Sequence, residues 1–308
     1  MRRLRARRAG PPAPFVVGAA RSGTTLLRMM LDSHRQLAVP FETQFLPELM
    51  EAAGRPGADA GSVVEVLVGH RRWPDFGLDA DEMRAAFASV RPFELGEAMR
   101  HFYRAYARAQ GKPRWGDKSP GYALHIRRIA RLLGEAHFVH LIRDGRDVRL
   151  SQLRRGDRHP PAAKHARRWR RRVQTGRRQG ARVDHYMEVR YESLIADPEP
   201  ELRRICEFLR LEFDPEMLTY HERAAERLSE IDRDLEAGQE LAEARERPLF
   251  RAGDRLDFHK LTREPPRGDR VARWKREMPV EDLADFERVA GGLLSELGYE
   301  LGSPPAPR

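Results

Sequence analysis

The amino-acid sequence predicts an α/β fold in which a central parallel sheet carries helices on both faces. Short apolar runs alternate with amphipathic segments along most of the chain, and a glycine-rich turn joins the first apolar run to the first amphipathic segment. The 308 residues are 40% hydrophobic and 34% charged, a balance that allows a large buried core. Strands that alternate with helices form right-handed β-α-β units, so the predicted sheet is parallel.

The N-terminal part of the chain supplies the first strands and helices of this pattern. Residues 14–20 form a strand because they are almost wholly apolar, and residues 24–31 form a helix because their apolar side chains share one face. Residues 37–40 form a short buried strand, and a helical pattern resumes at residue 41. Residues 51–112 alternate charged with apolar residues, as do amphipathic helices that lie outside a sheet.

The same alternation continues to the C-terminus. Residues 114–120 form a short strand that runs into a loop, and residues 136–144 form the clearest buried strand of the chain. The other predicted elements are an amphipathic helix at 122–133, a helix at 145–155, a basic helix at 165–181, a strand at 186–191, a helix at 198–211, charged surface helices at 221–247 and a packing helix after 270.

Composition limits the partners and the compartment. The net charge of +10 predicts an anionic partner such as a nucleotide, a nucleic acid or an acidic substrate. Cys206 is the only cysteine, which excludes an internal disulfide and favours a reducing compartment, so we expect a cytoplasmic protein. No segment reaches the ~20 apolar residues that a membrane span needs, and no His, Asp and Glu cluster has metal-ligand spacing. The oligomeric state is left open.

A glycine-rich loop follows the first predicted strand and opens the first helix. Its residues are Gly18, Ala19, Ala20, Arg21, Ser22, Gly23, Thr24 and Thr25. The spacing is that of a phosphate-binding loop, whose backbone N–H groups and helix N-terminus hold an anion. Thr24 stands where nucleoside triphosphatases carry a lysine, which argues against ATP hydrolysis, although Arg21 places a cation at the rim. The sequence therefore predicts an α/β, P-loop-like three-layer fold.

Two cations stand at the ends of predicted strands. Lys118 is one of only five lysines among 57 Lys and Arg residues, and its compact ammonium can approach a single oxygen as a point charge. Arg143 ends the most apolar strand, where a buried charge is costly unless it has a partner. That partner is either a bound anion or a neighbouring carboxylate, Asp144 or Asp147.

Five motifs in order along the chain resemble those of one enzyme family. The motifs are GAARSGTTLL (18–27), WGDKSP (115–120), HLIRDGRDVRLS (140–151), RYESLIADP (190–198) and RVARW (270–274). They are similar to motifs of sulfotransferases that use 3′-phosphoadenosine 5′-phosphosulfate (PAPS), especially the bacterial branch with an arginine-type 5′-phosphosulfate loop. Local similarity extends to tyrosylprotein sulfotransferases.

The resemblance implies one sulfotransferase domain at 14–300, between a basic flexible arm at 1–13 and a flexible tail at 301–308. It is weakest over 51–112 and 219–262, which we expect to be acceptor-side or lid insertions. These weakly matched stretches would build the acceptor pocket. The acceptor therefore stays open among a glycolipid, a sugar, a phenol, a peptide tyrosine and a small metabolite.

The family motifs also imply the residues that hold the donor. Those at the 5′-phosphosulfate are Arg21, Ser22, Gly23, Thr24 and Thr25. Arg143 and Ser151 match the family pair that holds the 3′-phosphate, and Arg155 lies one helical turn after Ser151 and adds a second cation. Tyr191 and Arg273 match family positions near the 3′-phosphate and the adenine.

Sulfuryl transfer needs an in-line arrangement, a base for the acceptor hydroxyl and positive charge near the leaving oxygen. Glu42 follows the strand at 37–40 and matches the base glutamate of tyrosylprotein sulfotransferases; its alternative role is a carboxylate at a helix start. Arg21 and Lys118 are the cations expected at the leaving oxygen, so no metal is required. His34 is the alternative base, or else a cap of the first helix.

The residues leave two other functions open. The arginine-rich segment 165–182, with Trp169 as a stacking surface, has the composition of a nucleic-acid-binding protein, although we expect no nucleic-acid partner. A P-loop kinase or nucleotide hydrolase is the second alternative. Steeply salt-dependent DNA retention would indicate the first of these, and magnesium-dependent ATP turnover the second.

Overall fold

The computed structural model describes residues 10–153, 160–222 and 264–302. Its centre is a four-stranded parallel sheet of order β4-β1-β5-β6. The strands are β1 (Ala13–Gly18), β4 (Asp117–Lys118), β5 (Ala136–Ile142) and β6 (Tyr186–Arg190). Every residue of the two central strands is buried, as expected of a parallel sheet with both faces covered. The predicted α/β fold with a central parallel sheet is therefore confirmed.

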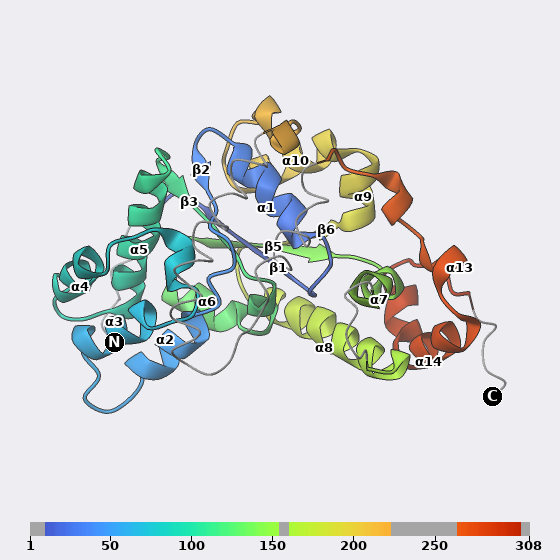
Figure 1. Cartoon of the computed structure of the whole chain (residues 1–308), viewed down its shortest axis with the longest axis horizontal. Helices are drawn as coiled ribbons and strands as arrows, with labels where there is room; N and C mark the ends of the chain where they lie inside the picture. Colours follow the sequence, from blue (N-terminus) through green and yellow to red (C-terminus); the bar gives the residue numbers. More distant parts are fainter. Residues whose placement is uncertain (1–9, 154–159, 223–263, 303–308) are drawn as a thin grey trace.

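Helices cover the two faces of the sheet (Figure 1). On one face lie α1 (Thr24–Ser33), α9 (Tyr191–Ala196) and α10 (Pro198–Phe208), and on the other lie α6 (Ile126–Leu132) and α8 (Ala162–Gly180). Alternate residues of a strand point to opposite faces, so Val16 packs with the first group whereas Phe15 packs with α6. Three layers result, with apolar cores above and below the strands.

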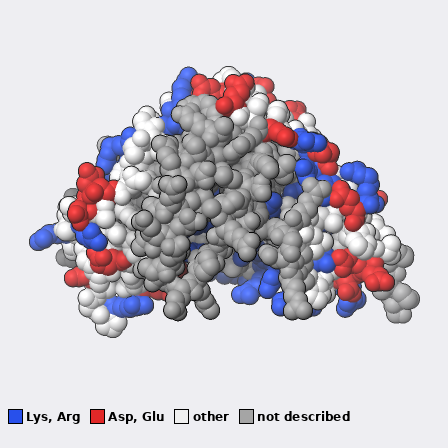
Figure 2. Space-filling model, in the orientation of Figure 1, with Lys and Arg blue, Asp and Glu red and all other residues white. Residues whose placement is uncertain are grey.

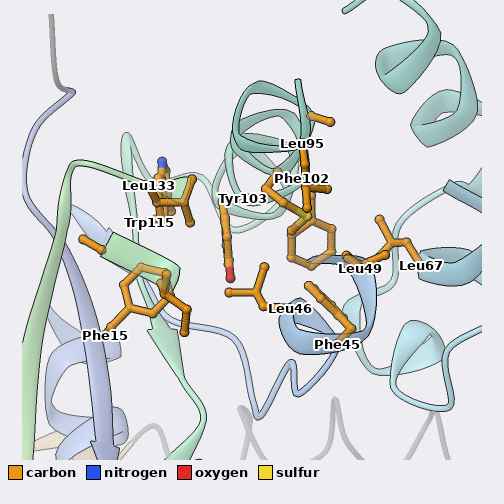
Figure 3. Close-up of a cluster of buried hydrophobic side chains, with 14 of the residues drawn as sticks. Phe15, Phe45, Leu46, Leu49, Leu67, Leu95, Phe102, Tyr103, Trp115 and Leu133 are labelled. Carbon is orange, nitrogen blue, oxygen red and sulfur yellow. The ribbon is translucent and has the colours of Figure 1, made fainter. Parts of the chain in front are cut away.

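A helical lobe lies beside the sheet. It contains α2 (Leu46–Ala53), α3 (Ala60–Val68), the 3-10 helix η1 (Trp73–Phe76), α4 (Ala80–Ala88) and α5 (Leu95–Ala109). Its core is continuous with that of the sheet, because Phe102 and Tyr103 of α5 pack toward Phe45 and Trp115 (Figure 3). Tyr103 and Trp115 stack with ring centroids 4.5 Å apart. Residues 51–112 thus contribute buried apolar area to the main core as well as surface.

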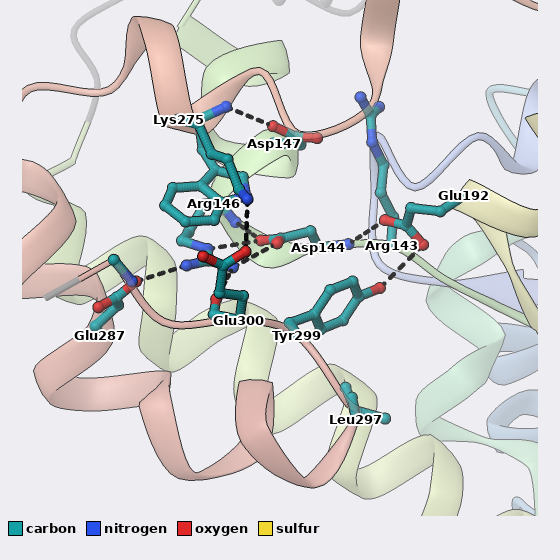
Figure 4. A network of polar contacts seen from close by, with 12 residues as sticks. Arg143, Asp144, Arg146, Asp147, Glu192, Lys275, Glu287, Leu297, Tyr299 and Glu300 are labelled. Carbon is teal, nitrogen blue, oxygen red and sulfur yellow. Dashed lines mark hydrogen bonds and ion pairs between the residues drawn. The ribbon is translucent and has the colours of Figure 1, made fainter. Parts of the chain in front are cut away.

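The C-terminal helices pack near the end of β5. They are the 3-10 helix η5 (Gly268–Arg270), α13 (Trp274–Glu277) and α14 (Val280–Glu296), and they meet α7 (Gly145–Leu153) and α8. Fully buried Arg146 joins these parts: it binds Asp144 at 2.7 Å and Glu287 at 2.5 Å and stacks over Trp274 (Figure 4). Breaking this buried network would leave an unpaired charge, so it holds α7 firmly against α14.

The second predicted strand is shorter than expected and lies outside the central sheet. β2 (Leu37–Ala38) pairs with β3 (Arg114–Trp115) in a separate two-stranded sheet. It ends because Val39 uses its backbone groups elsewhere: its N–H donates to Asp32 at 2.8 Å and its carbonyl accepts from Arg28 at 2.7 Å. The helix expected from residue 41 begins only at Leu46.

The remaining described elements are the 3-10 helices η2 (Pro120–Leu124) and η3 (Pro215–Met217). Of the helices predicted at 221–247, residues 223–247 lie outside the described residues. No helix in the described ranges is both long and apolar enough to cross a membrane.

Candidate active site

A cavity of about 710 Å³ opens where the carboxyl ends of β1, β4 and β5 meet, which is where open parallel sheets bind their ligands. Its described lining includes the loop after β1, the side chains of Phe41, Glu42 and Gln44, most of residues 118–125, the residues after β5 and β6, and parts of the segment 265–273. Among the residues that the structure describes, nine cationic side chains line it: Arg21, Arg71, Arg72, Lys118, Arg143, Arg172, Arg267, Arg270 and Arg273. Glu42 is the one carboxylate residue among the described lining residues. This charge balance suits a ligand with several negative charges.

The glycine loop forms the floor of the cavity and leads directly into α1. Gly23 has a left-handed backbone with φ +93°, and a Cβ placed there would lie 2.4 Å from the Tyr191 ring. A Cβ on Gly18 would lie 2.6 Å from the Leu141 carbonyl oxygen. No side chain caps the start of α1 at Gly23, so the first N–H groups of the helix can bind an anion.

The predicted loop residues occupy different positions around this turn. Arg21 has φ +72°, lines the cavity and donates from Nε to Ser151 Oγ at 3.2 Å. Thr24 and Thr25 also line the cavity, whereas Ser22 is buried and its hydroxyl has no hydrogen-bond partner among the described residues.

Arg143 lies at the end of β5 and is only 5% exposed. It donates to the backbone carbonyls of Arg21 at 3.2 Å and Arg270 at 2.8 Å, and its guanidinium lies 4.2 Å from the centre of the Tyr191 ring. Within the described ranges its Nε has no hydrogen-bond partner. A buried guanidinium whose hydrogen bonds go to neutral carbonyl oxygens can still take an anion.

The alternative carboxylate partners of Arg143 are engaged elsewhere. Asp144 makes its ion pair with Arg146, so it is not the partner of Arg143 that the sequence offered as an alternative to a bound anion. Asp147 accepts the backbone N–H of Trp274 at 2.9 Å, and burial raises the pKa of Asp147 to about 6. The carboxylates closest in sequence therefore do not neutralise the Arg143 charge by direct contact.

The other predicted donor-binding residues divide into three cases. Ser151 and Tyr191 line the cavity beside Arg21 and Arg143. Arg273 also lines it but is paired with Glu277 one helical turn later. Arg155 lies outside the described residues.

Lys118 and Glu42 form an ion pair in the cavity wall. Lys118 Nζ lies 3.1 Å from Glu42 Oε1 and 3.4 Å from Thr25 Oγ1, and the lysine side chain is 1% exposed. Burial would raise the pKa of Glu42, but Lys118 and Arg72 outweigh it and bring that pKa to about 2. Burial lowers the pKa of Lys118, against the opposing effect of Glu42. The predicted base and the predicted cation thus lie in direct contact.

Sequence reasoning left two neighbours of Glu42 unidentified. Arg72, in the loop before η1, places Nη2 3.8 Å from Glu42 Oε2, and Gln44 donates its side-chain amide to the same oxygen. Arg72 falls in the segment 51–112, where no motif marks it. Gln44 follows Glu42 by two residues, but nothing in the pattern assigns it a role.

His34 lies at the C-terminal end of α1, and its ring contacts the protein through both nitrogens. Nε2 lies 2.9 Å from the Glu212 carbonyl oxygen, and Nδ1 accepts the backbone N–H of Gln36 at 3.0 Å. It does not line the cavity in the described part of the chain. The His34 backbone N–H donates to the Leu31 carbonyl oxygen at 3.2 Å at the C-terminal end of α1, which favours the capping role. Glu42 precedes the first residue of α2, Leu46, so it does not occupy the alternative position in the first turn of a helix.

The arginine-rich helix α8 has two kinds of basic residue. The exposed ones are Lys164, Arg167, Arg168, Arg171 and Arg178. Figure 2 shows Lys and Arg side chains along the lower edge of this face, in the region where α8 runs in Figure 1. Arg177 instead pairs with Glu188 at 2.9 Å, and Arg172 points toward the main cavity. The described residues contain no group of three His, Cys, Asp or Glu side chains that could hold a metal ion.

Comparison with known proteins gives a consistent result. A sequence profile described as "Sulfotransferase family" matches residues 12–215. The chain is 25% identical to protein-tyrosine sulfotransferase A of Caenorhabditis elegans over 301 residues, which cover 96% of this chain and 69% of that protein. It is 24% identical to protein-tyrosine sulfotransferase 1 of Danio rerio over 302 residues, with 96% and 74% coverage.

Solved structures show the same fold at low sequence identity. The sulfotransferase domain from the curacin biosynthetic pathway superposes with a TM-score of 0.60 at 20% identity, over 95% of this chain and 99% of that one. The sulfotransferase domain from the Synechococcus PCC 7002 olefin synthase gives a TM-score of 0.58 at 23% identity, over 96% and 98%.

Proposed function

Because the chain belongs to the sulfotransferase family and is a transferase that uses a sulfate donor, we propose that the donor is PAPS and the acceptor a hydroxyl group. The observation that carries this proposal is the cavity in which nine cations and a phosphate-binding loop surround the single described carboxylate, Glu42. PAPS is strongly anionic, and Glu42 is available to receive a proton.

Separate sets of residues bind the two charged groups of the donor, the 5′-phosphosulfate and the 3′-phosphate. The N–H groups of the loop at 18–25, together with Arg21, take the 5′-phosphosulfate. Arg143 takes the 3′-phosphate through its Nε, which has no hydrogen-bond partner in the described part of the chain, and the Ser151 hydroxyl lines the same cavity. Tyr191 supports both sites, since its ring lies close to Gly23 and also to the Arg143 guanidinium.

The reaction is an in-line displacement at sulfur. The acceptor oxygen bonds to the sulfur, the bond from sulfur to the 5′-phosphate oxygen breaks, and the hydroxyl proton passes to Glu42. Negative charge develops on the leaving oxygen, where Lys118, Arg21 and the loop N–H groups stabilise it. Adenosine 3′,5′-bisphosphate then leaves.

Glu42 must become a stronger base during this reaction than its pKa of about 2 allows. Lys118 and Arg72 cause the low value, because both place positive charge beside the carboxylate. Binding of the donor places anionic oxygens near Glu42 and so offsets the effect of these cations on the carboxylate. The pKa of Glu42 therefore rises when the donor binds, which couples proton transfer to donor binding.

The acceptor class follows from the chemistry of the base and from the relatives. A carboxylate beside the sulfuryl position serves alcohol and phenol acceptors, and the relatives named above are protein-tyrosine sulfotransferases. We therefore propose a phenol or alcohol acceptor, to be identified with a panel of acceptors and labelled PAPS.

Binding of adenosine 3′,5′-bisphosphate tests the donor assignment. At ~100 times its dissociation constant this nucleotide adds about 2.7 kcal/mol to the free energy of unfolding by mass action, which a thermal-shift assay detects. Arg143→Ala should weaken it roughly ten- to hundredfold and leave AMP nearly unchanged, because AMP lacks the 3′-phosphate.

Arg149→Ala is the matched control, since Arg149 also follows β5 but binds Asp282 at 2.6 Å instead of lining the cavity. Arg149→Ala should lower the stability of the protein but should not change the affinity for adenosine 3′,5′-bisphosphate relative to that for AMP. Equal losses of both nucleotides in Arg143→Ala would contradict the 3′-phosphate site, and stronger stabilisation by ATP with magnesium would favour a kinase.

A further inference from the structure

A buried cluster of hydroxyl groups surrounds Asp117, directly behind the Lys118–Glu42 pair. Asp117 is fully buried, and its Oδ2 accepts two hydrogen bonds, from Thr43 Oγ1 at 2.6 Å and from Tyr103 OH at 2.8 Å. Its other oxygen, Oδ1, has no partner among the described residues. Asp117 is the residue before Lys118, and Thr43 is the residue after Glu42.

Further hydrogen bonds join the same two chain segments. Thr43 Oγ1 lies 2.8 Å from Tyr122 OH and 3.2 Å from Ser119 Oγ. Ser119 Oγ accepts the backbone N–H of Gln44 at 3.3 Å, and Tyr122 OH accepts that of Leu46 at 3.1 Å. The segment that carries Glu42 is thus fastened at several points to the segment that carries Lys118.

The loop after Glu42 needs such support. Gln44 has φ +59°, a left-handed conformation that costs a non-glycine residue free energy and persists only where its surroundings hold it. Successive residues of an extended strand point to opposite sides, so Asp117 faces the interior whereas Lys118 faces the cavity.

Stability alone gives a weak reason for a carboxylate at this place. A buried carboxylate is costly, and replacing buried charge with well-packed apolar groups is often neutral or stabilising. Burial also raises the pKa of Asp117 to about 6, against the hydrogen bonds from Thr43 and Tyr103. The carboxylate supplies one oxygen that accepts hydrogen bonds from hydroxyl groups of two different segments.

We propose that Asp117 and Thr43 are positioning residues, which fix the Glu42 loop against β4 so that the base and the Lys118 ammonium face one reaction site. The kinetic part of this inference, an effect on kcat, rests on the proposed function. The positional part states only that Asp117 and Thr43 hold Glu42 in contact with Lys118. Neither side chain lines the cavity in the described residues, so both act through their neighbours.

Thr43→Val and Tyr103→Phe make a matched pair of variants. Each removes one hydroxyl from the same Asp117 oxygen, but only Thr43 belongs to the Glu42 loop; Tyr103 lies on α5. We expect Thr43→Val to lower kcat roughly ten- to hundredfold, since displacement of a catalytic group by about 1 Å has that effect. Affinity for adenosine 3′,5′-bisphosphate should stay unchanged, Thr43→Ser should restore kcat, and Tyr103→Phe should lower the melting temperature without changing kcat.

Asp117→Asn and Asp117→Leu separate hydrogen bonding from charge. The asparagine side-chain oxygen can accept the hydrogen bonds from both hydroxyl groups, and its amide nitrogen takes the place of Oδ1, so this variant should keep most of kcat. The leucine side chain cannot accept either hydrogen bond, so Asp117→Leu should lower kcat as Thr43→Val does. Equal kcat in Thr43→Val and Tyr103→Phe, both folded, would overturn the proposal.

The pKa of Glu42, measured by carbon-detected NMR, gives a readout that does not need turnover. Loosening the loop moves Glu42 away from Lys118, so Thr43→Val should raise this pKa from about 2 toward its ordinary value of 4.5, and Tyr103→Phe should not. A Glu42 pKa unchanged in Thr43→Val would contradict the positional part. If Thr43→Val raised the Glu42 pKa in this way but the wild-type protein transferred no sulfuryl group, the proposed function alone would be contradicted.

Discussion

Glu42 is the residue on which the proposed chemistry depends most. Glu42→Gln keeps the shape of the side chain but cannot accept the proton, so the rate with an alcohol acceptor should fall about 10²–10⁴-fold. An acidic phenol loses its proton more easily and should show a smaller loss. Single-turnover measurements with both acceptors check this, with adenosine 3′,5′-bisphosphate affinity as the control. Near-normal turnover with the alcohol would remove Glu42 from the mechanism.

The same residue makes stability depend on pH. The pKa of Glu42 is about 2 in the folded protein, below its ordinary value of 4.5. The ion pair of Glu42 therefore adds its full stability above about pH 4.5, and this stability is lost as the pH falls through the folded-state pKa of about 2. Glu42→Gln should therefore be less stable than wild type at about pH 7, and the difference should shrink toward about pH 3. Urea unfolding at both pH values measures it. A difference that grows on acidification would contradict the ion pair as the cause.

The pairing of Lys118 with Glu42 shows what a single sequence can and cannot predict at the residue scale. Both were predicted separately, one from the rarity of lysine and its motif, the other from its place after a strand. Their contact at 3.1 Å joins residues 76 positions apart, and local patterns carry no information about such a distance. Arg72 was missed because its role comes only from where the helical lobe meets the cavity.

At the scale of elements, the buried parallel strands were the easiest to predict. β5 differs from the predicted 136–144 by two residues, since a strand covered on both faces is apolar throughout. The predicted length of β2 was wrong, because side chains of α1 form hydrogen bonds with both the N–H and the carbonyl of Val39. Such competition depends on how α1 packs, which the local pattern does not show.

The turn from β1 into α1 gives a prediction at this scale. Gly23→Ala would place a Cβ 2.4 Å from the Tyr191 ring at φ +93°, so the ring that contacts Arg143 must move. We expect adenosine 3′,5′-bisphosphate binding to weaken at least roughly tenfold, as for the loss of a charge-assisted contact. Calorimetry on the variant measures this loss.

Gly57→Ala is the control for backbone strain, because Gly57 also has a left-handed backbone, φ +75°, but an added Cβ there meets nothing within 4 Å. It should cost about 1 kcal/mol of stability and leave nucleotide binding intact. If both variants bound the nucleotide equally well, the close fit of Gly23 against Tyr191 would have no part in binding.

At the scale of the whole molecule, the C-terminal helices complete the donor side of the cavity. The segment 265–273 lines the cavity and leads into α13 and α14, which the contacts of Arg146 join to α7. Arg270 offers its carbonyl to Arg143, so the last part of the chain helps to orient a guanidinium from β5. The RVARW motif pointed to this region, but its contact with the end of β5 depends on the folded topology.

The distribution of charge over the molecule leads to a prediction about metals. Phosphoryl-transfer enzymes use magnesium to offset charge on the leaving group, whereas in the proposed mechanism Arg21, Lys118 and the loop N–H groups, which line the cavity, stabilise that charge. We therefore expect sulfuryl transfer to continue at its full rate after EDTA treatment. Formation of the labelled sulfated acceptor should be followed at constant ionic strength, because exposed cations also respond to salt.

Lys118→Ala provides the matched control for the metal experiment. If Lys118 supplies the charge at the leaving oxygen, its removal should lower the rate roughly a hundredfold while donor affinity stays nearly intact, as for a contact made mainly in the transition state. Activity lost with EDTA and restored by magnesium in the wild type would show instead that the protein cations do not suffice. A metal requirement that appeared only in Lys118→Ala would place the missing charge at the leaving oxygen, where this lysine acts.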